Sequence, residues 1–132
     1  MALPRYVIVL MMENRSFDHV LGFVPGVGDL SPSDYNRVDP SRPRSARVRV
    51  SADADPITLI DPDHTFEATQ EQMFGGGSPT GPAPMNGFVS SYIKAAGGDV
   101  ALGKTVMRCQ APAAVPVLAQ LARGFCACTR WF

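Results

Sequence analysis

The stretch from residue 6 to residue 22 constrains the fold of this chain more than any other. Its first seven residues, 6–12, are all apolar and include Val, Ile and Tyr, which predicts a buried strand, most often a parallel one covered on both faces. A helix is predicted next, with Asn14 or Ser16 as its N-cap, because apolar residues recur at helical spacing at Phe17, Val20, Leu21 and Val24. The sequence therefore predicts an α/β fold.

Two polar residues, Glu13 and Asn14, occupy the turn between this strand and this helix. The turn lies at the carboxyl end of the predicted strand, where open α/β sheets bind their ligands. A carboxylate and an amide oxygen side by side can hold a hard divalent cation, which prefers oxygen ligands, although two protein ligands are too few for tight binding. A capped helix with a solvated Glu13 is the commoner arrangement and explains the same spacing.

Length and composition set the broad class of the protein. The chain has 132 residues, of which 45% are hydrophobic and 18% charged, and its formal net charge is 0. These values predict one modest domain with a core and no global field toward nucleic acid or an acidic membrane. The run at 6–12 is too short to span a membrane, and no signal peptide is visible because Glu13 follows directly without a cleavage site.

The three cysteines, Cys109, Cys126 and Cys128, lack the spacing of a zinc site. Free cysteines are among the most buried residue types, so we expect buried structural thiols at all three positions.

An Arg-rich loop is predicted over about 25–58, because Gly, Pro, Ser and Asp dominate its first half. Its arginines are either an anion-binding patch or one face of a charged edge strand. The edge strand is favoured because charges alternate with Val across residues 46–50. The five arginines are Arg37, Arg42, Arg44, Arg47 and Arg49.

Three further helices are predicted in the second half. One covers residues 66–74 with Thr65 or Asp63 as its cap, and a shorter one covers residues 88–96. A third begins near Pro116, and residues 125–132 look like the start of another strand. The third helix has an apolar face made of Val117, Leu118, Leu121, Ala122 and Phe125.

The segment MMENRSFDHVLG resembles the N-terminal signature of the bacterial phosphoesterase family that includes non-haemolytic phospholipase C and the AcpA-type acid phosphatases. Three later segments, DPDHTFEATQEQMFGGG, PMNGFV and VPVLAQLARGFCACTRWF, are similar to further segments of that family, so the likeness covers roughly 4–23 and 59–132. The chain departs from the family pattern at Thr65-Phe66, Asn86, Thr129 and Gln70. The resemblance implies a partial alkaline-phosphatase-like α/β/α sandwich with a mostly parallel sheet.

The resemblance also implies site residues. Glu13 and Asn14 match the family's ligands for one active-site divalent metal ion of unknown identity. His64 is then the candidate catalytic residue, donating a hydrogen bond to a phosphate or protonating a leaving oxygen, although a surface or helix-capping histidine fits equally well. Asp18 and His19 are expected to orient the first turn, and Arg15 to pair with an anionic substrate or with an acidic neighbour.

In the resembled family a Ser or Thr nucleophile follows shortly after the Trp-Phe that here stands at 131–132, so no nucleophile is expected in this chain. We therefore expect residues 1–132 to form the N-terminal part of a phosphoesterase domain whose C-terminal portion is absent. The expected substrate is a phosphate ester, either a phospholipid or a phosphomonoester. The alternative is an inactive fragment that binds metal weakly or needs a partner chain. Relatives are often exported, so localisation stays open.

Overall fold

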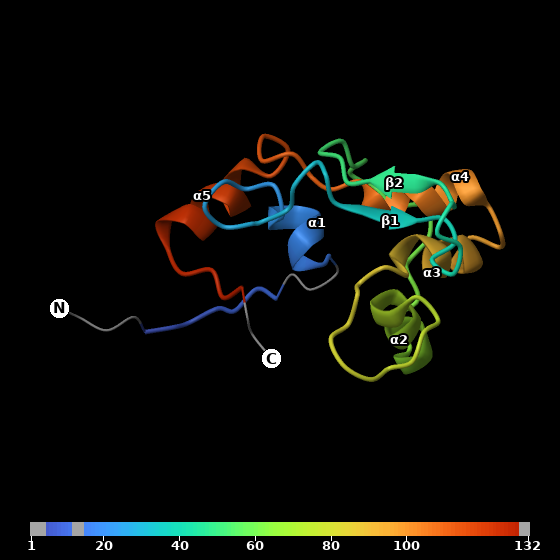
Figure 1. Ribbon diagram of the computed structural model, residues 1–132. Coiled ribbons are helices and arrows are strands. Elements are labelled where there is room, and N and C mark those ends of the chain that lie inside the picture. Colours follow the sequence, from blue (N-terminus) through green and yellow to red (C-terminus); the bar gives the residue numbers. More distant parts are fainter. Residues whose placement is uncertain (1–4, 12–14, 130–132) are drawn as a thin grey trace.

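The computed structural model describes residues 5–11 and 15–129 of the chain (Figure 1). Helices and a two-stranded sheet make a small α/β domain, as the sequence predicts at that level. The elements are, in order, α1 (Phe17–Leu21), β1 (Tyr35–Arg37), β2 (Arg47–Arg49), α2 (Phe66–Phe74), α3 (Phe88–Ala95), α4 (Val100–Gly103), the 3-10 helix η1 (Lys104–Met107) and α5 (Pro116–Gly124).

The sheet is an antiparallel hairpin that lies inside the stretch predicted as a loop. Strand β2 confirms the charged edge strand predicted around residues 46–50, while β1 was not predicted. The predicted mostly parallel sheet is not present among the residues described, where a parallel pairing occurs as an isolated bridge between Ser51 and Arg108. The hairpin forms because Asn36 and Val48, which pair with each other, turn inward onto the rest of the domain.

Helix α3 is the centre of the packing. Figure 1 shows it between α2 on one side and the hairpin with α4 on the other. Its Val89 is fully buried and packs with Val50 and Met107, so that the core joins β2, α3 and η1. Half-buried apolar side chains surround this cluster, namely Phe23, Val38, Val48, Phe88, Ile93 and Val106.

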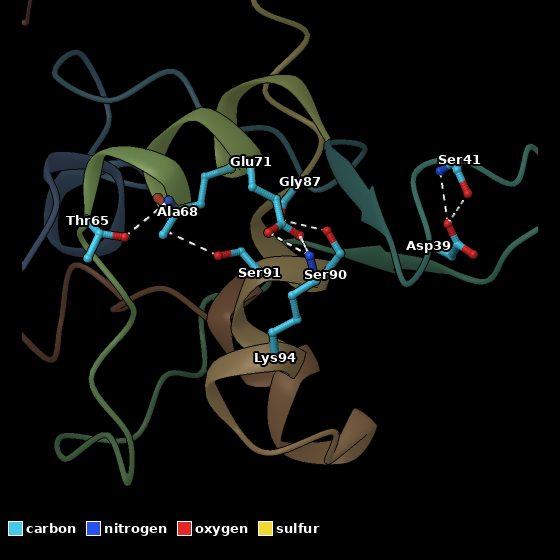
Figure 2. Close-up of polar contacts among 10 residues, drawn as sticks. Asp39, Ser41, Thr65, Ala68, Glu71, Gly87, Ser90, Ser91 and Lys94 are labelled. Carbon is cyan, nitrogen blue, oxygen red and sulfur yellow. Dashed lines mark hydrogen bonds and ion pairs between the residues drawn. The ribbon is translucent and has the colours of Figure 1, made fainter. Parts of the chain in front are cut away.

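Helix α2 forms where the sequence predicts it, because both of its ends carry capping residues. The Thr65 hydroxyl accepts a hydrogen bond from the Ala68 N–H at 3.3 Å, and Gly75 ends the helix in the left-handed conformation. Lys94 of α3 forms an ion pair with Glu71 of α2 at 2.7 Å, which ties the two helices together (Figure 2).

The buried strand predicted at residues 6–12 is not formed among the described residues of this segment. Tyr6–Met11 runs as an extended, unpaired segment whose side chains are all exposed, with Ile8 at 92%. A buried parallel strand needs neighbouring strands to accept its backbone hydrogen bonds, and none of the described residues supplies one. The strand expected at 125–132 is likewise irregular over 125–129, and its last three residues lie outside the described part.

Within residues 5–11 and 15–129 there is no helix with the length and apolar character that a bilayer crossing demands.

Candidate functional site

A groove of about 1000 Å³ lies between α1 and α5. Arg15 and His19 line it from the side of α1, and Leu118 and Leu121 line it from α5. Cys126 and Cys128 line it from the segment that follows α5. The groove thus combines an apolar wall with a small number of polar side chains, the composition typical of small-molecule sites.

His19 is held in this groove by backbone contacts on both sides. Ser16 caps α1 by accepting a hydrogen bond from the His19 N–H at 3.2 Å, and the His19 carbonyl accepts one from the Gln110 N–H at 2.7 Å. The second contact fixes α1 against the segment that leads into α5.

The imidazole of His19 is unusual because its Nε2 atom is buried and has no hydrogen-bond partner among the described residues. Burial, and to a lesser extent the positive charge of Arg15, lower the pKa of His19 below its ordinary value. The ring is therefore neutral at neutral pH, so that one nitrogen carries a proton and the other is able to accept a hydrogen bond.

Arg15 reaches away from the helix to a distant loop. Its Nη1 donates a hydrogen bond to the Thr58 hydroxyl at 2.9 Å, across 43 positions of sequence. No carboxylate in the described part of the chain pairs with it within 4.0 Å, and its side chain is one of those that line the groove.

Asp18 does not line that groove and is exposed. Partial loss of solvation raises the pKa of its carboxyl, and the negative charges of Asp29 and Asp34 raise it further. Asp18 thus belongs to an acidic surface beside α1. Its expected role in orienting the first turn is not tested by these contacts.

The predicted metal ligands, Glu13 and Asn14, lie outside the described residues. Among the residues that are described, no three His, Cys, Asp or Glu side chains gather in a way that could hold a metal ion. The described residues alone therefore do not fit the implied divalent ion, and no chemical step through a metal is assigned to them.

His64 does not line the groove with Arg15 and His19. It lies on the exposed segment that precedes α2, with Nδ1 3.3 Å from the Pro62 carbonyl. That segment is fixed by the Tyr92 hydroxyl, which donates to the Ile60 carbonyl at 2.5 Å, and by Gln72, whose Nε2 donates to the Asp63 carbonyl at 2.7 Å. His64 is therefore not part of the groove that Arg15 and His19 line.

The sequence missed the contribution of α5 to this groove. The sequence predicts only that the helix has an apolar face, and on this face Val117, Leu121 and Phe125 are exposed, while Ala119 is the buried residue of the helix. An amphipathic pattern shows that one face of a helix is apolar, but a groove wall and a packed core give the same pattern. No further signal in the sequence distinguishes them.

The prediction of three buried thiols is correct only for Cys109. Burial, together with the charge of Asp18, raises the pKa of Cys109 to about 11. Cys126 and Cys128 are exposed, because the segment that carries them forms no buried strand. The thiol of Cys128 has its pKa raised by a hydrogen bond with Cys126.

The described residues thus define an α/β domain with a ligand-sized groove beside a short capped helix. The model of the Phosphoesterase family matches residues 5–132, and the chain belongs to this family, as its N-terminal signature predicts.

Curated relatives extend this result to plant proteins. The chain is similar to non-specific phospholipase C1 of Arabidopsis thaliana, with 37% identity over 130 residues that cover 96% of this chain and 24% of the relative. It is also similar to non-specific phospholipase C6 of that plant, with 38% identity over 133 residues and the same two coverages. Non-specific phospholipase C3 is 36% identical over 140 residues, which cover 96% of this chain and 25% of the relative. The chain therefore spans about a quarter of the length of these relatives. No solved structure matches it.

Proposed function

We propose that this chain is the N-terminal part of a hydrolase that cleaves phosphate ester bonds, of the phospholipase C or acid phosphatase type. The match of the phosphoesterase family to residues 5–132 carries this proposal. Relatives named as non-specific phospholipases C favour a phospholipid over a phosphomonoester as the substrate. Most of each relative lies outside the matched part, so the Ser or Thr nucleophile is proposed to come from the corresponding remainder of the domain.

The site proposed within this chain is the turn at residues 13–15 and the groove beside it. Glu13 and Asn14 are proposed as ligands of a divalent ion, which when bound neutralises charge on the phosphate oxygens. Arg15 supplies guanidinium N–H groups for a phosphoryl oxygen, supported by its lack of a carboxylate partner among the described residues. His19 stays neutral and holds the turn through its backbone contacts, and His64 remains a candidate proton donor.

We also propose that residues 6–12 and 125–132 become neighbouring strands of a parallel sheet in the complete alkaline-phosphatase-like sandwich. The full exposure of the apolar segment Tyr6–Met11 supports this, since burial between two layers would remove that surface from water. Exposed Phe125, at the start of the second segment, supports it in the same way.

The test is to graft this chain in place of the matching quarter of Arabidopsis non-specific phospholipase C1 and to assay p-nitrophenylphosphorylcholine hydrolysis. We expect divalent-metal-dependent turnover in the graft and none in the 132-residue chain alone. Glu13→Ala should lower the turnover of the graft by at least about 10-fold, because a lost ligand costs no less than a lost outer partner of a ligand. Glu67→Ala is the matched control, since Glu67 is an exposed carboxylate in the first turn of α2.

Two outcomes contradict the proposal. A folded graft that is inactive, while the plant enzyme is active in the same assay, would favour an inactive fragment that at most binds metal weakly. Equal activity of the Glu13→Ala and Glu67→Ala grafts would remove Glu13 from the site.

A further inference from the structure

The outer face of the β1–β2 hairpin carries three arginines and one tyrosine, and we propose that it docks the protein on an anionic phospholipid membrane. These four residues, Tyr35, Arg37, Arg47 and Arg49, are called the arginine face. The inference goes beyond the hydrolytic site. It rests on the proposed function only in choosing a membrane over other polyanions.

Strand geometry places the four side chains on one surface. In the antiparallel register Tyr35 pairs with Arg49 and Arg37 pairs with Arg47, while Asn36 and Val48 between them face inward. The two like charges at Arg37 and Arg47 thus stand directly opposite each other, an arrangement that destabilises a strand pair. The hairpin is anchored well enough to hold this arrangement, because the buried Asn36 bonds to the Met85 carbonyl at 3.1 Å and to the Phe88 N–H at 2.8 Å.

The charges of the arginine face are not neutralised by the described part of the protein. Arg37 donates to the Ser45 carbonyl at 2.9 Å and Arg49 to the Pro32 carbonyl at 3.5 Å. Arg47 lies 4.4 Å from the centre of the Tyr35 ring. No described carboxylate comes within 4.0 Å of these three guanidinium groups.

Acidic residues do occur near the hairpin, but they have other partners. Asp39 pairs with Arg42 at 3.0 Å. It also accepts hydrogen bonds from Ser41 (Figure 2). Asp34 accepts a hydrogen bond from the Ser31 N–H at 2.8 Å. The chain as a whole has no net charge, so the positive charge is a local property of this face.

The chemistry of the face fits lipid phosphates better than nucleic acid. Guanidinium groups of Arg47 and Arg37 lie 4.4 and 5.6 Å from the Tyr35 ring centre and compete with a base for stacking on it. A tyrosine beside arginines is instead suited to the headgroup layer, where the ring is half in apolar surroundings and the guanidinium groups bind phosphates. A hydrolase of phospholipids meets its substrate at such a surface.

Sedimentation with lipid vesicles tests this proposal with the 132-residue chain. We expect the chain to bind vesicles that mix phosphatidylcholine with phosphatidylglycerol, and to bind pure phosphatidylcholine vesicles much more weakly. Arg47→Gln with Arg49→Gln should weaken partitioning onto the mixed vesicles by about 30-fold, since each basic residue near an anionic surface contributes about fivefold. Raising the salt from about 0.05 M to about 0.5 M should weaken it as well.

The matched control is Arg5→Gln with Arg123→Gln, which removes the same charge from exposed positions near the chain start and on α5. This control should bind as the unchanged chain does, and so should Arg47→Lys with Arg49→Lys, which keeps both charges. Equal binding of the unchanged chain to the two kinds of vesicle would overturn the proposal, as would equal losses in the two Gln pairs. Tight binding to heparin or DNA without vesicle binding would also overturn it. None of these binding measurements needs turnover, so the membrane proposal and the proposed hydrolytic function can fail separately.

Discussion

At the scale of single residues, His19 links the groove to the stability of the fold. Its pKa is lowered from 6.5 by burial and by Arg15, whereas the unfolded chain exposes the same ring to water. Below pH 6.5 the unfolded state therefore binds more protons than the folded state. The contribution of His19 to the free energy of unfolding is fully present above pH 6.5. It is lost as the pH falls from there toward the lower pKa of the folded state.

We predict that His19→Phe flattens the pH dependence of the free energy of unfolding just below pH 6.5. One proton contributes a slope of at most about 1.4 kcal/mol per pH unit, and the variant should lose a part of the slope no larger than this. The measurement is urea unfolding at several pH values between about 7.5 and about 5. His19→Gln separates the effect of titration from that of packing, because glutamine does not titrate in this pH range but keeps a polar side chain at the position. An unchanged slope in both variants would show that His19 does not titrate differently on folding.

At the scale of elements, the contact between α2 and α3 depends on the last carbonyls of α2, which have no hydrogen-bond partner within the helix. These carbonyls need partners outside the helix. The Glu71 carbonyl accepts the Gly75 N–H at 2.7 Å, and the Gln72 carbonyl accepts the Gly87 N–H at 2.9 Å. The Met73 carbonyl accepts the N–H of residue 85 at 2.7 Å. The turn before α3 therefore serves as the C-terminal cap of α2.

Gly87→Ala should destabilise the protein, because a Cβ atom at Gly87 would overlap the Glu71 carbonyl and the backbone of Gly75. Backbone atoms cannot move aside as a flexible side chain does, so we expect a loss of about 2–3 kcal/mol in the free energy of unfolding, measured in urea. Gly124→Ala is the control, since nothing lies within 4 Å of a Cβ there and the residue is in α5. It should be neutral or stabilise by up to about 1 kcal/mol. Similar effects of the two substitutions would mean that the α2–α3 contact is not formed as described.

The same element scale shows what the sequence can predict. Helix α2 was predicted over its observed range because its cap and the glycine after it are both local signals. Strand β1 was not predicted, because the contacts of Asn36 that hold it reach 49 and 52 positions along the chain. The groove is equally non-local, since Arg15 depends on Thr58 and His19 on Gln110. Local motifs identified the family, but not the groove wall on α5.

At the scale of the whole molecule, apolar surface is divided unevenly between two regions. The core around α3 buries Val89 completely, whereas the segment Tyr6–Met11 and one side of α5 leave large apolar side chains in water. Surface of this kind marks a site of contact with other protein or with ligand. In the proposed sandwich it is the surface that the rest of the sheet covers.

The same substitution at one exposed and one buried valine compares what the two regions contribute to the free energy of unfolding. Val7 is 78% exposed and Val89 is fully buried, so Val7→Ala and Val89→Ala delete the same atoms from opposite environments. In the 132-residue chain we expect Val89→Ala to lower the free energy of unfolding by about 2–3 kcal/mol, from lost burial and the cavity left behind. Val7→Ala should change it by less than about 0.5 kcal/mol, as substitutions at exposed sites usually do. Urea unfolding followed by circular dichroism gives both values. A cost for Val7→Ala near that of Val89→Ala would mean that residues 6–11 are packed in solution, as the sequence-based prediction of a buried strand requires.

The graft with the plant enzyme gives the complementary measurement. If the proposed sheet forms there, Val7→Ala should lower the free energy of unfolding of the graft by about as much as Val89→Ala lowers that of the chain. The difference between the chain and the graft therefore tests whether the remainder of the domain buries this segment.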